Sequence, residues 1–199
     1  MTKKNKEIHS LIPLEDFKAL MGVDSREDKM SRFCLTTATL NIERYCMRTF
    51  LRKKKTEILE LSGDWEVLLG EYPVSEILGV YGINRQCERY LEPYFYRPMF
   101  GCVLGEELPF SILISSSLKQ FRFSAVKVIY WVGYKNGAVP SDLSSACMEL
   151  AMWNMNRYRG RRIGMTGNIK GAGIQGEHFE LSMPENVRKL LEPYRRKTI

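Results

Sequence analysis

The side chains that most often do covalent or metal chemistry are sparse in this sequence of 199 residues. It has two histidines, His9 and His178, and five cysteines at wide, irregular spacing, without a CxxC pair. Catalysis by serine or cysteine needs a nearby base, and zinc sites need ligands at short spacing. The serine runs at 115–117 and 144–145 have no histidine in a motif context. The sequence therefore predicts no metal site and no enzyme, and it favours buried free thiols in a reducing compartment.

A glycine pattern at 171–176 has the GxGxxG spacing of dinucleotide-binding loops. In those folds the pattern follows a strand and opens a helix whose N-terminus holds the pyrophosphate. In this sequence it follows a basic, glycine-rich stretch and precedes Glu177-His178-Phe179, and no GxxxxGK[ST] phosphate loop occurs. We therefore expect a flexible loop over 160–176 and no bound cofactor.

Two arginine-rich segments could bind anions. The first, residues 157–162, holds four arginines within six residues. The second lies near the end of the sequence and contains Tyr194, Arg195, Arg196 and Lys197. Cations at the C-terminus of a helix are stabilised by its dipole by about 0.3–1 kcal/mol, which is a purely structural role. Arginines beside a glycine-rich loop also suit contact with phosphates or with an acidic partner. The sequence leaves both interpretations open for Arg157, Arg159, Arg161 and Arg162.

Composition and charge narrow the class of protein. The chain is 44% hydrophobic and 27% charged, which is typical of a globular protein. No apolar run approaches the ~20 residues of a membrane span, and the first ten residues lack the apolar core of a signal peptide. Residues 1–55 carry a net charge of +6 and residues 140–199 a net charge of +4, whereas residues 56–139 carry −3. This segregation suits contacts between a basic face of one subunit and an acidic face of the next.

Helical spacing marks both ends of the chain. Residues 14–21 follow Pro13 and precede Gly22, so they predict a short helix with a glycine C-cap. A second helix is predicted from Asp24 or Ser25 to about Phe50, on a stripe that includes Met30, Cys34, Ala38, Ile42 and Tyr45. Residues 140–160 and 182–194 predict two more helices, the first with a Ser or Asp cap.

The middle of the chain alternates between apolar and polar residues. Residues 57–61 and 65–69 predict a hairpin, and 77–81, 111–114, 126–132 and 179–181 predict further strands. Residues 89–100 contain two prolines and predict an edge strand or loop. We therefore expect a mainly α fold with a β-rich insert, of the α+β class. It is a small helical bundle (13–55 and 140–199) with an excursion of hairpin and short strands (56–139), in a single domain (13–199) after a flexible arm (1–12).

The order of these features resembles the head–tail connector family of tailed phages, also called adaptor or head-completion proteins. The resemblance covers most of the chain, although the aromatic-rich stretch 86–119 is longer than expected for the family. The residues that carry it are, in chain order, Leu14–Leu20, Ile42–Tyr45 with Arg48–Phe50, Leu68–Val74, Val128–Tyr134 with Val139–Leu143, Arg157 with Arg159, and Met183–Pro184 with Leu190–Arg196.

The resemblance implies a structural protein of a phage or prophage. Such subunits form a closed, dodecameric ring on the portal protein, made in the bacterial host cytoplasm and retained in the virion neck. The ring extends the DNA channel toward the tail, so the implied partners are the portal, neighbouring copies, a tail-side connector protein and the genomic DNA, with no membrane. Heterologous contacts of this kind close into rings.

Within this interpretation the basic segments have separate roles. Arg159, Arg161, Arg162 and Lys170 are expected to face the DNA channel or the neighbouring subunit. Tyr194, Arg195, Arg196 and Lys197 are expected to reach the portal. Two alternatives remain: a free DNA-binding module, for which no reader motif is recognisable, and a small enzyme with the aromatic-rich insert as a pocket wall.

Overall fold

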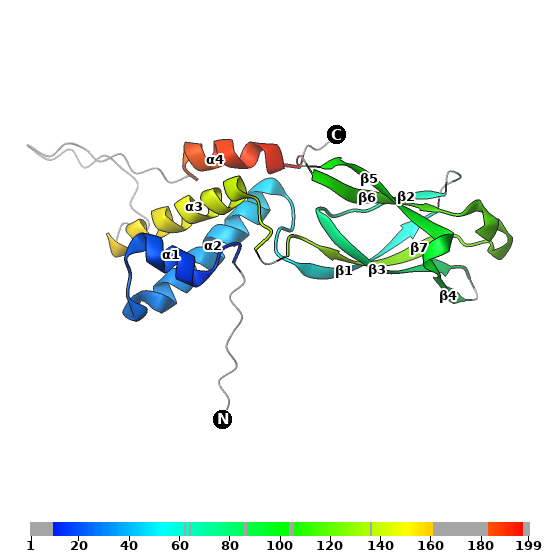
Figure 1. Ribbon diagram of the computed structural model, residues 1–199, viewed down its shortest axis with the longest axis horizontal. Coiled ribbons are helices and arrows are strands. Elements are labelled where there is room, and N and C mark those ends of the chain that lie inside the picture. The colour runs from blue at the N-terminus through cyan, green and yellow to red at the C-terminus, as the bar shows by residue number, and fades with distance from the viewer. Residues whose placement is uncertain are drawn as a thin grey trace, which may run out of the picture. The chain divides into compact units, whose positions relative to one another are not determined.

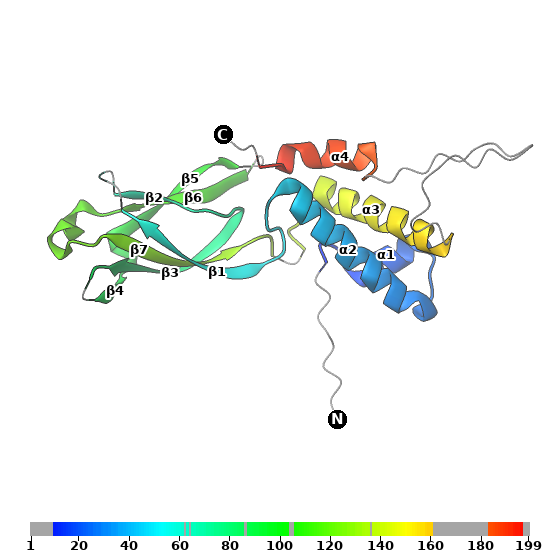
Figure 2. The same cartoon turned by 180° about the vertical axis from the view of Figure 1, so that it is seen from behind.

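The computed structural model describes residues 10–61, 63, 65–85, 87–103, 106–135, 137–160 and 183–196. The chain divides into two compact units. The helical unit is built from both ends of the sequence, Met1–Met47 and Val139–Ile199, and the β unit is Arg48–Ala138. Figures 1 and 2 show the elements of each unit from opposite sides. Apart from Gly160, the expected loop over 160–176 lies outside the described residues, as does the expected strand 179–181.

The helical unit confirms the predicted helices at both ends of the chain. Gly22 ends the first helix in the left-handed conformation (φ 61°), and Gly160 follows the third. The N-cap of the third helix is Pro140, without the expected side-chain cap. The helices are α1 (Leu14–Met21), α2 (Asp28–Cys46), α3 (Ser141–Arg159) and α4 (Glu185–Leu191), with 3-10 turns at Ser25–Glu27 and Glu192–Tyr194.

Helix α2 is shorter than predicted at both ends. The carboxylate of Asp24 accepts a hydrogen bond from the backbone N–H of Arg26 at 2.8 Å, so a 3-10 turn forms before α2 begins. At the other end Met47 adopts φ 52°, and its N–H bonds back to the last turn of the helix. The chain leaves the helix there, and the prediction of a helix up to Phe50 is wrong.

Apolar stripes hold the helices of this unit together. Helices α2 and α3 lie side by side, with α1 against α2 and α4 against α3 (Figures 1 and 2). Leu11 and Ile12, before α1, are also buried, and the Leu11 N–H donates to the Thr39 hydroxyl. The residues buried between the helices are Phe17 of α1; Cys34, Leu35, Ala38, Ile42 and Cys46 of α2; Leu143, Ala146, Cys147, Leu150 and Met155 of α3; and Val187 and Leu191 of α4.

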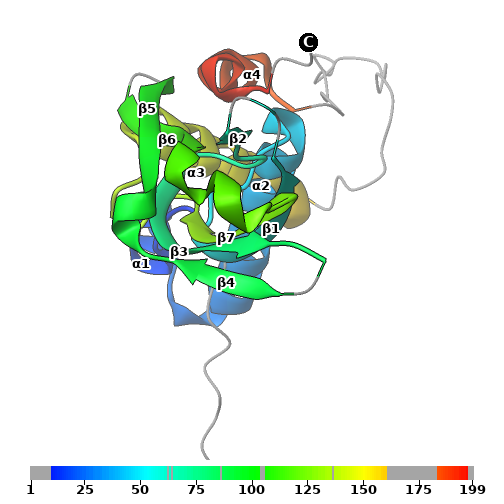
Figure 3. The same ribbon diagram turned by 90° about the vertical axis from the view of Figure 1, so that its right-hand side faces the viewer.

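The β unit consists of two antiparallel sheets that face each other as layers (Figure 3). The first sheet has the order β1 (Lys53–Glu60), β7 (Ala125–Val132), β3 (Val74–Ile83), β4 (Glu88–Leu91). The second has the order β2 (Glu66–Leu68), β6 (Glu106–Ile114), β5 (Tyr96–Val103). Two 3-10 turns, Pro93–Phe95 and Ser116–Phe121, join strands. The proline-containing segment supplies β4 and β5, each at the edge of its sheet, which confirms the edge-strand prediction.

The prediction of a mainly α fold with a β excursion is wrong. The chain is a mixed α+β protein with a substantial β component, because seven strands of its described residues build two sheets around a hydrophobic core of their own. The core residues come from both layers, among them Val67, Ile112 and Ile114 of one sheet and Val80, Val126, Val128 and Tyr130 of the other. The β segment is therefore a packed layer structure rather than an appendage of the bundle.

The predicted hairpin of 57–61 with 65–69 is also wrong. Strand β1 pairs along its whole length with β7, from Lys53 opposite Val132 to Glu60 opposite Ala125. Strand β2 pairs with β6 in the other sheet. The backbone between β1 and β2 adopts a left-handed conformation at Trp65 (φ 59°), and the chain passes from one sheet to the other instead of folding back.

A part-buried cluster of charged and hydroxyl groups lies around the middle of β1. The carboxylate of Glu57 accepts hydrogen bonds from the Tyr130 hydroxyl at 2.8 Å and from the Gly70 N–H at 3.0 Å, and it pairs with the Lys55 ammonium at 2.8 Å. Lys55 also pairs with Glu71 at 3.1 Å. Burial alone would raise the pKa of Glu57, but these donors outweigh it and hold the pKa below its ordinary value.

We expect the Glu57→Gln variant to lose about 1–3 kcal/mol of unfolding free energy at pH 7. Because the folded-state pKa of Glu57 is lowered, the ionised group stabilises the fold above its unfolded-state pKa, and that stability is lost as the pH falls through the folded-state value. The difference between wild type and variant should shrink as the pH falls from 7 toward 3. Urea unfolding at several pH values, followed by tryptophan fluorescence, measures it. A constant difference across this range would contradict the assignment.

A basic groove on the helical unit

The middle and end of α2 and α3 bring arginines and aromatic rings together on one side of the helical unit. Arg44 and Tyr45 lie near the end of α2, and Trp153 and Arg157 lie one turn apart near the end of α3. Because the two helices pack side by side, these residues border a groove of about 380 Å³. Its described lining contains no acidic residue and consists of Asn41, Arg44, Tyr45, Leu150, Trp153, Asn154, Arg157 and Met183.

The guanidinium of Arg157 is held in place by its neighbour on the same helix. Its central carbon lies 4.5 Å from the centre of the Trp153 ring, a cation–π contact at i, i+4 spacing. Stacking of this kind uses the face of the guanidinium and leaves the N–H groups at its edge available for an acceptor. Arg157 is thus preoriented to bind a carboxylate or phosphate oxygen at the groove.

Asn154 adds an unsatisfied polar group to the groove. The residue is buried, with a relative exposure of 7%. Its Nδ2 has no hydrogen-bond partner among the described residues. A buried amide without a partner costs about 1–3 kcal/mol, so a water or an acceptor group that enters the groove and reaches this amide is favoured.

The predicted channel or subunit contacts are only partly described. Arg159, at the end of α3, forms a two-point ion pair with Glu27, with Nε–Oε1 at 2.9 Å and Nη2–Oε2 at 2.6 Å. Its charge is therefore matched within the helical unit. The other predicted contacts, Arg161, Arg162 and Lys170, lie outside the described residues, as do His178 and the glycine pattern at 171–176.

The predicted portal contacts at the chain end are anchored on the same unit. Tyr194 is buried, and its hydroxyl donates to Asp142 Oδ1 at 2.5 Å. The backbone N–H of Arg196 donates to the Cys46 carbonyl at 2.9 Å. The Arg195 guanidinium lies over the Tyr45 ring, 5.6 Å from its centre, whereas Lys197 is outside the described residues. The structure thus places Arg195 next to the groove, because the Tyr45 ring that Arg195 contacts is part of the groove's lining.

Sequence reasoning missed Arg44, Tyr45 and Trp153 as functional candidates. It placed Tyr45 and Trp153 in apolar stripes and Arg44 among charges off the stripe. The Trp153–Arg157 spacing was a usable signal, since residues four apart on a helix are neighbours. The approach of Arg44 to Arg157 had no local signal because these residues come from opposite ends of the chain.

The cysteines do not assemble into a site in the described part of the chain. Cys34, Cys46 and Cys147 are buried, and burial raises the pKa of Cys34 and of Cys147 to about 11, so these thiols stay protonated. Cys87 is exposed. The described residues hold no group of three or more candidate metal ligands, and none of their helices has the length and hydropathy of a membrane span.

Comparison with known proteins identifies the family. The chain is similar to solved structures of gene transfer agent (GTA) particles: the neck of an empty GTA particle with C6 symmetry (19% identity, TM-score 0.58), the virion of a native GTA particle (16%, 0.57) and the neck of a native GTA particle with C12 symmetry (16%, 0.54). Each match covers 95% of this chain and 91% of the other. No curated protein matches the chain. The model of the head completion protein family matches residues 10–197, which confirms the resemblance seen in the sequence motifs, and the chain belongs to the head completion protein family.

Proposed function

We propose that this head completion protein is a structural subunit that forms a ring at the neck of a phage-like particle, binds the portal and extends the DNA channel toward the tail. The observation that carries the proposal is the family match, which spans both the helical and the β unit. The similar solved chains come from GTA necks described with C6 and C12 symmetry, which supports a ring of copies. The role is structural, as it is for the family and these neighbours.

The basic groove supplies the portal contact in this proposal. Arg195 belongs to the chain end for which a portal contact was predicted, and it lies over the same Tyr45 ring that borders the groove. Arg44 and Arg157 extend that contact along α2 and α3. Two guanidiniums around a groove without acidic lining residues suit carboxylates on the facing surface of the portal. Arg161, Arg162 and Lys170 keep their proposed place at the DNA channel or the neighbouring subunit.

The test is co-assembly with the portal protein encoded by the same genome. The chain alone and the mixture are run on a sizing column with light scattering. We expect a stable complex with one subunit per portal subunit. A folded chain that never co-elutes, even at low salt and high concentration, would contradict the proposal.

A binding measurement with free duplex DNA distinguishes this proposal from the alternative of a DNA-binding module. A module that neutralises six to ten phosphates would bind free duplex and lose about 10³–10⁵-fold in affinity between 50 and 200 mM salt. A connector meets DNA inside an assembled ring, so we expect weak binding to free duplex. Tight, strongly salt-dependent duplex binding without co-assembly would favour the alternative.

A further inference from the structure

The last described residues of the chain are fixed to the helical unit at several points. Figures 1 and 2 show that α4 ends on the side of this unit where α2 ends and α3 begins. From there the 3-10 turn Glu192–Tyr194 leads into Arg195 and Arg196, whose side chains are exposed. These two arginines belong to the predicted portal contact. Their position therefore depends on what holds this short segment to the helices.

Tyr194 differs from Arg195 and Arg196 because it is buried, with a relative exposure of 4%. Its hydroxyl donates to Asp142 Oδ1 at 2.5 Å. The same oxygen accepts a hydrogen bond from the Leu143 N–H at 2.9 Å, in the first turn of α3. A carboxylate at the N-terminus of a helix is also stabilised by the helix dipole. Asp142 is thus a fixed acceptor, and it joins the turn after α4 to the start of α3.

The end of α2 provides a second anchor for the same segment. The Arg196 N–H donates to the carbonyl of Cys46, the last residue of α2, at 2.9 Å. The last carbonyls of a helix lack partners within the helix, so this bond satisfies one of them. The hydroxyl of the preceding residue, Tyr45, donates to Glu192 Oε2 at 3.2 Å. Contacts with α2 are thus made both before and after the buried tyrosine.

We propose that Tyr194 is a positioning residue for the portal contact, because its hydrogen bond to Asp142 fixes the direction in which the two arginines leave the helical unit. The inference rests on the proposed function, since it concerns the portal contact of the chain end. A segment that is already ordered loses less conformational entropy when it binds. In this proposal Tyr194 acts through the arginines that follow it and does not itself touch the portal.

Portal binding of the Tyr194→Phe variant of the full-length chain tests this role. The phenyl ring keeps the packing, and only the hydroxyl is lost. We expect the affinity for the portal to fall about tenfold, which corresponds to about 1.4 kcal/mol, or to the ordering of about one residue. Hydrogen exchange of the Arg196 amide in the isolated variant should be at least about tenfold faster than in the wild type, since its bond to Cys46 opens more often. Circular dichroism checks that the helices are intact.

Changes at Asp142 test the hydrogen bond from its other side. Asp142→Asn keeps an oxygen that can accept from the Tyr194 hydroxyl, so we expect it to bind the portal nearly as tightly as the wild type. Asp142→Ala removes the acceptor and should weaken binding about as much as Tyr194→Phe. Because both changes break the same bond, the double variant should bind no more weakly than either single variant.

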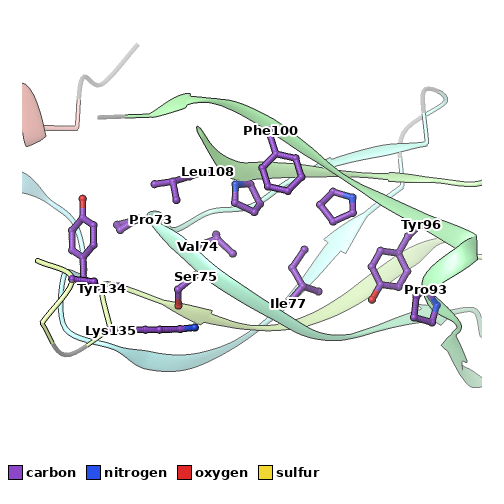
Figure 4. Close-up of a pocket in the computed structure, with 14 residues that line it drawn as sticks. Pro73, Val74, Ser75, Ile77, Pro93, Tyr96, Phe100, Leu108, Tyr134 and Lys135 are labelled. Carbon is purple, nitrogen blue, oxygen red and sulfur yellow. The ribbon is translucent and has the colours of Figure 1, made fainter. Parts of the chain in front are cut away.

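Tyr96→Phe is the matched control, because it removes a tyrosine hydroxyl from the other unit. Tyr96 lies in the wall of a hollow of about 680 Å³ in the β unit (Figure 4). We expect this variant to bind the portal like the wild type and to leave the exchange of the Arg196 amide unchanged.

A chain without the basic side chains separates positioning from a general effect on the fold. With Arg195→Ala, Arg196→Ala and Lys197→Ala combined, the side chains that Tyr194 positions are gone. Adding Tyr194→Phe to this variant should therefore change portal affinity little. A further tenfold loss would show that Tyr194 supports the fold or contacts the portal itself, and it would overturn the proposal.

The results distinguish this inference from the proposed function. If the wild type binds the portal and Tyr194→Phe binds it as tightly, the positioning role is overturned and the connector function stands. The same holds if the variant binds less tightly while exchange at Arg196 is unchanged. If the wild-type chain forms no complex with the portal, both are overturned.

Discussion

Replacing Gly133 with alanine is expected to lower the free energy of unfolding by at least about 3 kcal/mol, one of the two largest effects predicted for this protein. Gly133 follows β7 and adopts φ 86°, a conformation that costs other residues about 1–2 kcal/mol. A Cβ at this position would also lie 2.4 Å from the carbonyl oxygen of Leu51 and 2.7 Å from that of Phe50. Those atoms belong to the backbone, so the clash cannot be relieved by turning a side chain.

The contact at Gly133 holds two distant segments of the β unit together. The Tyr134 N–H donates to the Phe50 carbonyl at 2.9 Å, and the Gly133 N–H donates to the Pro73 carbonyl at 2.8 Å. Leu51 and Tyr134 form an isolated bridge, and the rings of Phe50 and Tyr134 stack with centres 6.4 Å apart. An alanine would push the segments before β1 and after β7 apart and weaken all of these contacts.

Gly137 provides the matched control. It also has a positive φ, 80°, but a Cβ there would meet no atom within 4 Å. We expect Gly137→Ala to cost only the conformational part, about 1–2 kcal/mol. Thermal unfolding should show the Gly133 variant about 6–12 °C below the wild type. Equal melting temperatures for the two variants would show that the close approach to Leu51 is not what requires glycine at 133.

The sequence predicted the helices well because their signals are local. The stripe Leu143, Ala146, Cys147 and Leu150 lies within two turns of one helix, and all four side chains are buried. Gly22 and Gly160 mark helix ends by their immediate position. Such features depend on residues within one or two turns, so periodicity and capping residues are enough to find them.

The sheets could not be predicted in the same way because their pairings join distant segments. The strong alternation of β7 was recognised in the sequence. Its partners β1 and β3, however, lie more than 40 residues earlier in the chain, and no local pattern specifies this pairing. Local reasoning therefore joined 57–61 to 65–69 as a hairpin and underestimated the β unit. The reason for three of the motif residues is seen only in the folded chain. Val128 and Tyr130 are buried in the core, and Gly133 lies close to the backbone of Leu51.

The residues of the candidate site were likewise predictable only where their signal in the sequence is local. Arg157 and Arg195 were noticed because arginines cluster in the sequence, whereas Arg44 was an isolated charge on a helix surface. Its importance depends on the packing of α2 against α3, which no local pattern specifies. Conversely, Arg159 and Tyr194 have partners, Glu27 and Asp142, that only the folded chain reveals.

Reversing the two groove charges together, with Arg44→Glu and Arg157→Glu, is expected to weaken co-assembly with the portal at least about 100-fold. Truncating one member of a desolvated charge pair costs about 2–5 kcal/mol, and about 1.4 kcal/mol corresponds to a tenfold change in affinity. Reversal adds repulsion from the carboxylates that the groove binds in our proposal. Arg44 is exposed and Arg157 is partly exposed, so the unfolding temperature should change little.

The control is Arg26→Glu, a single charge reversal on the same unit, which is compared with Arg44→Glu and Arg157→Glu taken one at a time and then with the double variant. The Arg26 side chain is 93% exposed. Its Nε lies 3.8 Å from Asp24 Oδ2, which is too far for a strong ion pair. All variants have their circular dichroism and melting temperature checked, and portal binding is then titrated at low and moderate salt. Arg157→Lys refines the result, because lysine keeps the charge but loses the planar fork that stacks on Trp153. If the double variant binds the portal as tightly as Arg26→Glu, the groove does not make the portal contact, and that contact must fall to other residues of the chain.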